Sequence, residues 1–77
     1  MVAHVTPMQA IYLTRLAAEP AGPVSAYDMF NRLRMSKLSV ARMVSSGVIE
    51  RHLIGGLSHY RLTAAGRDVI QSQGVAA

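Results

Sequence analysis

The stretch SGVIERHLIGGLSHYRLTAAG, residues 46–66, decides the fold of this chain. Two runs of β-favouring residues, 48–53 and 57–62, flank the dipeptide Gly55-Gly56, which is typical of two-residue hairpin turns. The stretch therefore predicts an antiparallel hairpin. With both glycines in the turn, the register pairs Ile54 with Leu57, Leu53 with Ser58, His52 with His59, Arg51 with Tyr60, Glu50 with Arg61 and Ile49 with Leu62.

Side chains alternate between the two faces of such a hairpin. The inner face, which we expect to meet the core near its base, carries Ile49, Arg51, Leu53, Ser58, Tyr60 and Leu62. The outer face is polar and basic, and it carries Glu50, His52, His59 and Arg61, with Ile54 and Leu57 at the tip. The sequence thus predicts a base that belongs to the core and a flank that meets solvent or a ligand.

A first helix is predicted upstream from Thr6-Pro7-Met8-Gln9, which combines a capping hydroxyl, a first-turn proline and a capping-box glutamine. Its apolar residues recur at helical spacing and are predicted to face the core: Met8, Ile11, Tyr12 and Leu16. Pro20 and Pro23 end this helix, because proline cannot continue a helical hydrogen-bond ladder. Val24 after them is predicted to be a single buried extended residue.

Two further helices form a helix-turn-helix pattern. Ser25 caps the first of them, in which Met29, Phe30 and Leu33 are apolar. Ser36 caps the second, residues 37–45, and Gly47 is suited to its C-terminal closure. The residues predicted to point inward from 37–45 are Val40, Met43 and Val44. Arg34 occupies the turn position where many such motifs carry glycine, which indicates either a strained residue or a different turn geometry.

Beyond the hairpin, Thr63 caps a last helix that runs from Ala64 to about Gln71 and packs through Val69 and Ile70. The chain of 77 residues is then one domain, residues 1–77, with frayed ends at about 1–5 and 73–77. Its fold class is α+β and mostly α, with a three-helix core, a two-stranded hairpin and a C-terminal helix.

Basic residues are concentrated in the middle of the sequence. Eight Lys and Arg against four Asp and Glu give a net charge of +4, and six of the eight fall between residues 32 and 61, where Glu50 alone opposes them. Such a basic segment is either a solvated face or the footprint of a polyanion such as nucleic acid. The chain has no cysteine, no signal-peptide pattern and no apolar run that could span a bilayer, so we expect a cytoplasmic protein.

The order of elements resembles the winged-helix family of bacterial transcriptional regulators. The specific likeness lies in SSGVIERHLIGGLSHYRLTAAGRDVI, residues 45–70, which is similar to the wing region of MarR- and PadR-type regulators, including a Tyr-x-Leu-Thr-x-x-Gly segment that enters the last helix. The resemblance covers about residues 24–72. It departs from the family in the helix 37–45, which is about one turn shorter than usual and would serve as the recognition helix.

The resemblance implies binding to double-stranded DNA. Because a single module this small would bind weakly, we expect a homodimer on a symmetric site, although the chain lacks the long extra helices by which larger members of the family dimerise. The recognition helix would enter the major groove with Arg42 on guanine, while Ser36 and Lys37 meet phosphate. Ser36 serves equally well as a helix cap, and the sequence leaves both roles open. The DNA-binding residues predicted in this way are Arg34, Ser36, Lys37, Ser39, Arg42, Arg51, His52, His59 and Arg61.

A second interpretation of the same fold is a protein-interaction module, an adaptor or inhibitor that uses the apolar wing tip, Ile54 and Leu57, as its interface. Catalysis is not expected, because the sequence has no nucleophile-base set, phosphate-binding glycine loop or carboxylate cluster. We expect no metal and no cofactor, since His52 and His59 supply two ligands and do not complete a zinc site. No membrane partner and no small-molecule substrate is predicted.

Overall fold

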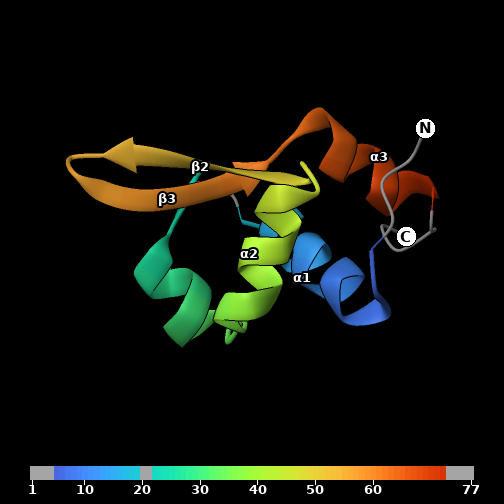
Figure 1. Cartoon of the computed structure of the whole chain (residues 1–77), viewed down its shortest axis with the longest axis horizontal. Coiled ribbons are helices and arrows are strands. Elements are labelled where there is room, and N and C mark those ends of the chain that lie inside the picture. The colour runs from blue at the N-terminus through green and yellow to red at the C-terminus, as the bar shows by residue number, and fades with distance from the viewer. Residues whose placement is uncertain (1–4, 20–21, 73–77) are drawn as a thin grey trace.

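The computed structural model describes residues 5–19 and 22–72, which form four helical segments and three strands (Figure 1). In chain order the elements are α1 (Pro7–Ala17), β1 (Val24–Ser25), η1 (Asp28–Arg32), α2 (Lys37–Ser45), β2 (Ile49–Ile54), β3 (Leu57–Leu62) and α3 (Ala64–Ser72). This is the predicted α+β fold class, and it is consistent with a winged helix. None of the helices within these ranges is long and apolar enough to cross a membrane.

The hairpin forms in the predicted register. All six predicted strand pairs, from Ile49 opposite Leu62 to Ile54 opposite Leu57, are present. Gly55 and Gly56 both have positive φ, 59° and 79°, as a two-residue turn that matches the strand twist requires. The hairpin extends well beyond the helices at one end of the molecule (Figure 1).

The sheet has one strand more than predicted. Val24 and Ser25 form β1, which pairs antiparallel with Tyr60 and His59 of β3, so that the strand order is β1-β3-β2. Val24 is buried, as predicted, at 5% exposure. Its pairing joins the helix-turn-helix to the hairpin, and a two-residue segment gives too short a pattern to be predicted as a strand.

The first helix begins as predicted, and its buried face agrees with the predicted one in part. Thr6 and Gln9 make both hydrogen bonds of the capping box. Tyr12 and Leu16 are buried as predicted, whereas Met8 and Ile11 are 52% and 44% exposed and Leu13, which was not predicted, is fully buried. The apolar run around Tyr12 fits two overlapping helical stripes, and the one through Leu13 meets the core. Pro20 lies outside the described residues.

The second helix is π-helical over Asp28–Arg32 instead of a regular α-helix, and the Leu33 amide donates to the Asp28 carbonyl at 2.8 Å. Met29 is fully buried, and Phe30 and Leu33 pack against the core, as predicted. Arg34 follows with φ of 59°, the left-handed conformation that glycine adopts at least cost. The turn thus has the geometry that usually takes glycine, but it is occupied by arginine.

The third helix has the predicted bounds and caps. Ser36 accepts a hydrogen bond from the Ser39 amide at 3.1 Å. At the other end, Gly47 has φ of 82°, and the Gly47 and Val48 amides donate to the Val44 and Met43 carbonyls, which is the Schellman closure. Val44 is 37% exposed, so its predicted inward position is wrong; the inward residues are Val40 and Met43.

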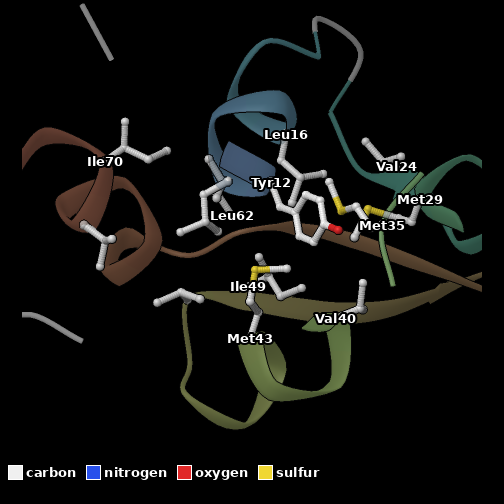
Figure 2. Close-up of a cluster of buried hydrophobic side chains, with 13 residues drawn as sticks. Tyr12, Leu16, Val24, Met29, Met35, Val40, Met43, Ile49, Leu62 and Ile70 are labelled. Carbon is white, nitrogen blue, oxygen red and sulfur yellow. The ribbon is translucent and has the colours of Figure 1, made fainter. Parts of the chain in front are cut away.

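The core lies where α1, α2, α3 and the inner face of the sheet meet (Figure 2). Tyr12 and Leu16 from α1 meet Met29 and Met35 from the helix-turn-helix, and Met43 rises from α2 toward the sheet (Figure 2). Val5, predicted to be frayed, packs against this core. Residues 1–4 and 73–77, the rest of the predicted frayed ends, lie outside the described residues.

Candidate nucleic-acid interface

The outward face of α2 carries the residues predicted to meet a ligand. Lys37, Ala41 and Arg42 are exposed, because Val40 and Met43 turn the opposite side of the helix into the core. Ser39 is half-buried next to the cap. The Ser36 side chain holds the Ser39 amide, which confirms its role as cap and leaves its predicted phosphate contact untested.

A groove of about 340 Å³ separates α2 from the inner face of the hairpin. Its walls come from η1, α2 and the two long strands, and its lining residues are Phe30, Lys37, Val40, Ala41, Val44, Arg51 and Tyr60. We call it the helix–wing groove. Lys37 and Arg51 are its two cations, and they come from opposite sides, one from α2 and one from β2. The groove therefore has apolar and aromatic walls and a positive charge on each side.

Lys37 is oriented by an aromatic ring. Its Nζ lies 5.9 Å from the centroid of the Phe30 ring, within the range of a cation–π interaction. The interaction places the ammonium group at the groove and leaves its charge unneutralised. Sequence reasoning identified Lys37 but missed the aromatic residues beside it. Tyr60 could have been identified from the predicted register, which places it on the inner face of the hairpin with Arg51.

The outer face of the hairpin has its own charge cluster. Arg61 Nε and His52 Nε2 lie 2.7 and 3.0 Å from the same oxygen, Oε1 of Glu50. The neighbouring His52 and Arg61 side chains lower the pKa of the Glu50 carboxyl below its ordinary value. Glu50 thus offsets the charge of Arg61 and holds His52 in place.

The four basic wing residues of the sequence prediction are not gathered on one surface. Arg51 lies on the inner face, whereas His52, His59 and Arg61 lie on the outer face. His59 sits opposite His52, and its Nδ1 lies 2.9 Å from the Leu57 carbonyl oxygen. Of these four residues, Arg51 is the one that lines the helix–wing groove, where it is joined by Tyr60.

Arg32 and Arg34, neighbours in sequence, have different surroundings. Arg32 binds Glu19 through both terminal nitrogens and also contacts Asp28 at 3.5 Å. The bond to Arg32 lowers the pKa of Glu19. The same ion pair links the end of α1 to η1. Arg34 is exposed in the turn before α2.

Ion pairing divides the basic residues of the described ranges into two groups. Arg32 and Arg61 are paired with carboxylates. The Lys and Arg side chains without an ion pair in residues 5–19 and 22–72 are Arg15, Arg34, Lys37, Arg42, Arg51 and Arg67. Four of these six, all but Arg15 and Arg67, lie in the turn before α2, on α2 or on the inner face of the wing. Unneutralised charge is therefore concentrated around α2 and the helix–wing groove beside it.

The wing tip is apolar and exposed. Leu53, Ile54 and Leu57 are 67%, 48% and 66% exposed. Ile54 and Leu57 were predicted as a partner interface, and Leu53 enlarges the apolar surface on the inner side. No group of three or more metal-ligating side chains is present within residues 5–19 and 22–72.

Comparison with known proteins gives one structural likeness. No protein-family model and no curated protein matches the sequence. The structure is similar to a crystal structure described as a probable transcriptional regulator from Pseudomonas aeruginosa, with a TM-score of 0.73 and 25% sequence identity. The match covers 94% of this chain and 58% of that one, so this chain spans little more than half of that protein's length.

Proposed function

We propose that this chain is a winged-helix DNA-binding protein that regulates transcription, with a wing of the MarR/PadR type. The observation that carries the proposal is the helix–wing groove, where Lys37 and Arg51 present unpaired positive charge from two elements. The similarity to a probable transcriptional regulator supports the same function.

In this proposal α2 enters the major groove of duplex DNA. Arg42, exposed on the outward face, makes a bidentate contact with guanine, for which its planar guanidinium is suited. A DNA strand passes along the helix–wing groove, and Lys37 and Arg51 bind its phosphates. The remaining predicted contacts, from the turn, the helix start and the outer wing face, are Arg34, Ser36, Ser39, His52, His59 and Arg61.

We further propose that residues 1–77 act as one domain, that two copies bind a symmetric site, and that the protein works in the cytoplasm by binding and not by catalysis. A recognition helix of nine residues reads few bases. Specific binding by so small a module is weak, and a second copy doubles the contacts.

The proposal is tested by titrating a fluorescent duplex of random sequence with the protein and two variants. Lys37→Gln combined with Arg51→Gln is expected to weaken binding by about tenfold or more, because two phosphate contacts are lost. The control removes one positive charge elsewhere: Arg67→Gln, on α3 and outside the helix–wing groove, is expected to bind within about twofold of wild type. If affinity followed net charge alone, Arg67→Gln would lose about half as much binding free energy as the double variant, and that result would contradict the proposal.

A second candidate function is protein interaction through the wing tip, favoured by the exposure of Leu53, Ile54 and Leu57. A purely phosphate-binding wing has no need of three exposed aliphatic side chains there. Leu57→Asp tests this candidate. If DNA binding is the function, the variant loses no more than about threefold in DNA affinity and its regulatory activity in cells persists. Loss of that activity with DNA affinity retained would support the interaction module.

A further inference from the structure

Leu38 is an exposed leucine on the side of α2 that faces away from the core. The residue is 60% exposed, and it belongs neither to the buried cluster nor to the half-buried residues packed against it. Val40 and Met43 point from the opposite side of the helix toward the sheet (Figure 2). The packing of the fold therefore gives no reason for an apolar side chain at position 38.

Leu38 also lies outside the helix–wing groove. That groove is lined by Lys37, Ala41 and Val44, whose spacing places them along a neighbouring side of α2. The remaining side carries Leu38 and Arg42, which are one helical turn apart and therefore adjacent on the helix surface. With a DNA strand in the helix–wing groove, we expect this remaining side to meet the base edges. Leu38 is the second residue of the helix, in the N-terminal part from which recognition helices contact bases.

The side chains of α2 are suited to two of the four bases. Asn and Gln make the paired contacts with adenine, and Asp and Glu accept from the amino group of cytosine. None of these four residue types occurs in KLSVARMVS, residues 37–45. Arginine pairs with guanine, and an apolar side chain contacts the C5-methyl group of thymine. The side of α2 that carries Leu38 and Arg42 has one residue of each kind.

We propose that Leu38 reads the C5-methyl group of a thymine that lies one or two base pairs from the guanine bound by Arg42. This inference rests on the proposed DNA-binding function and names the bases that α2 recognises. Residues one turn apart on a helix have Cβ atoms about 5–6 Å apart, and successive bases of a strand are about 3.4 Å apart along the DNA axis. The two contacts thus span one or two base-pair steps. Cytosine at the same place has no methyl group, and its amino group finds no acceptor on a leucine.

The test starts with the whole chain and a library of random-sequence duplex DNA, from which bound duplexes are selected and sequenced. The expected result is an enriched site with a T·A and a G·C pair one or two steps apart. Each thymine of the selected duplex is then replaced in turn by deoxyuridine, which removes the methyl group and leaves base pairing intact. Replacement of the thymine nearest the guanine is expected to weaken binding about fourfold, because one buried methyl group is lost.

Leu38→Ala identifies the side chain that reads this methyl group. The variant should fold, since the position is exposed and alanine favours a helix. It should bind the thymine and uracil duplexes with affinities equal within about 1.5-fold, because the partner of the methyl group is gone. Leu57→Ala is the matched control: it truncates a leucine that is 66% exposed on the wing tip, and it should keep the fourfold difference.

The possible failures are distinguishable. If the chain binds no duplex DNA, the proposed function is wrong and this inference is wrong with it. If the chain binds DNA but enriches no such pair of bases, or no thymine is sensitive to replacement, this inference alone is overturned. It is also overturned if Leu38→Ala keeps the fourfold difference between thymine and uracil, or if Leu57→Ala loses it.

Discussion

Gly66 is a residue at which the fold leaves no room for a side chain. It lies in the first turn of α3, and a Cβ there would overlap the backbone carbonyl of Val48. The contact belongs to a small junction. Thr63 caps α3 by accepting from the Gly66 amide at 3.1 Å, and its hydroxyl donates to the Gly47 carbonyl at 2.6 Å. This junction holds the start of α3 against the end of the α2 loop.

Gly66→Ala is therefore expected to destabilise the chain by about 1–3 kcal/mol, because the backbone must shift to admit the methyl group. The sign of the change in stability shows whether Gly66 is closely packed, since the same substitution at an open helical position stabilises a helix by about 1 kcal/mol. Chemical denaturation measures the difference, and Ala65→Gly, at the exposed neighbouring position, is the control for helix propensity. An unchanged or increased free energy of unfolding in Gly66→Ala would show that α3 is not packed this closely.

The glycine in Tyr-x-Leu-Thr-x-x-Gly was visible in the sequence, but its reason was not. Spacing places Gly66 three residues after a cap, whereas the carbonyl that excludes a side chain comes from Val48, eighteen positions earlier. Arg34 shows the opposite case. Its turn position was predicted correctly, and the structure determines which of the two open alternatives holds: the residue adopts the left-handed conformation with φ of 59°.

At the scale of elements, the hairpin was the most predictable part of the fold. Two glycines in a two-residue turn leave one register, and side-chain alternation then assigns both faces. The helices were less predictable. Helical spacing alone did not distinguish the stripe through Leu13 from the one through Met8 and Ile11, because which of them is buried depends on where the sheet lies. The π-helical geometry of η1 leaves no pattern of its own in the sequence.

The candidate nucleic-acid interface was also predictable only in part, because it too depends on how the elements pack together. Lys37, Arg42 and Arg51 follow from charge and register. The separation of Arg51 from the other basic wing residues also follows from alternation. The ion pairs do not follow from the sequence. Arg32 is neutralised by Glu19, and no local sequence pattern connects these two residues. The helix–wing groove combines η1, α2 and both long strands, and so requires the tertiary structure.

The ion pair between Glu19 and Arg32 predicts how stability depends on pH. Arg32 lowers the pKa of Glu19, so the folded chain binds fewer protons there than the unfolded chain. The stabilisation by this ion pair is complete above the ordinary pKa of 4.5. It is lost as the pH falls through the lower pKa that Glu19 has in the folded chain. We expect the Tm of wild type to fall between pH 7 and pH 3, and that of Glu19→Gln to fall less.

Thermal unfolding followed by circular dichroism at several pH values measures this effect. Asp68→Asn is the control, because Asp68 makes no ion pair within the described ranges, and it should keep the wild-type decline. Glu50, whose pKa is also lowered, contributes to the remaining decline in Glu19→Gln. Parallel curves for Glu19→Gln and wild type would contradict a stabilising role for this ion pair.

On the scale of the whole molecule, the helix–wing groove and α3 belong to different parts of the surface. The wing tip and α3 lie at opposite ends of the longest axis (Figure 1). Lys37 and Arg51 line the helix–wing groove. Arg67 lies on α3, outside that groove. Substitution of Arg67 therefore tests the effect of net charge separately from the effect of the groove.

The most direct test of the account is the salt dependence of duplex binding, measured for wild type and for Lys37→Gln combined with Arg51→Gln. Each phosphate contact contributes about −0.9 to the slope of log K against log salt concentration. If DNA binds in the helix–wing groove, the wild-type slope is steep, becomes shallower by about 2 in the double variant and stays unchanged in Arg67→Gln. Binding without salt dependence, or a slope that Lys37 and Arg51 do not alter, would contradict the assignment of the helix–wing groove to DNA.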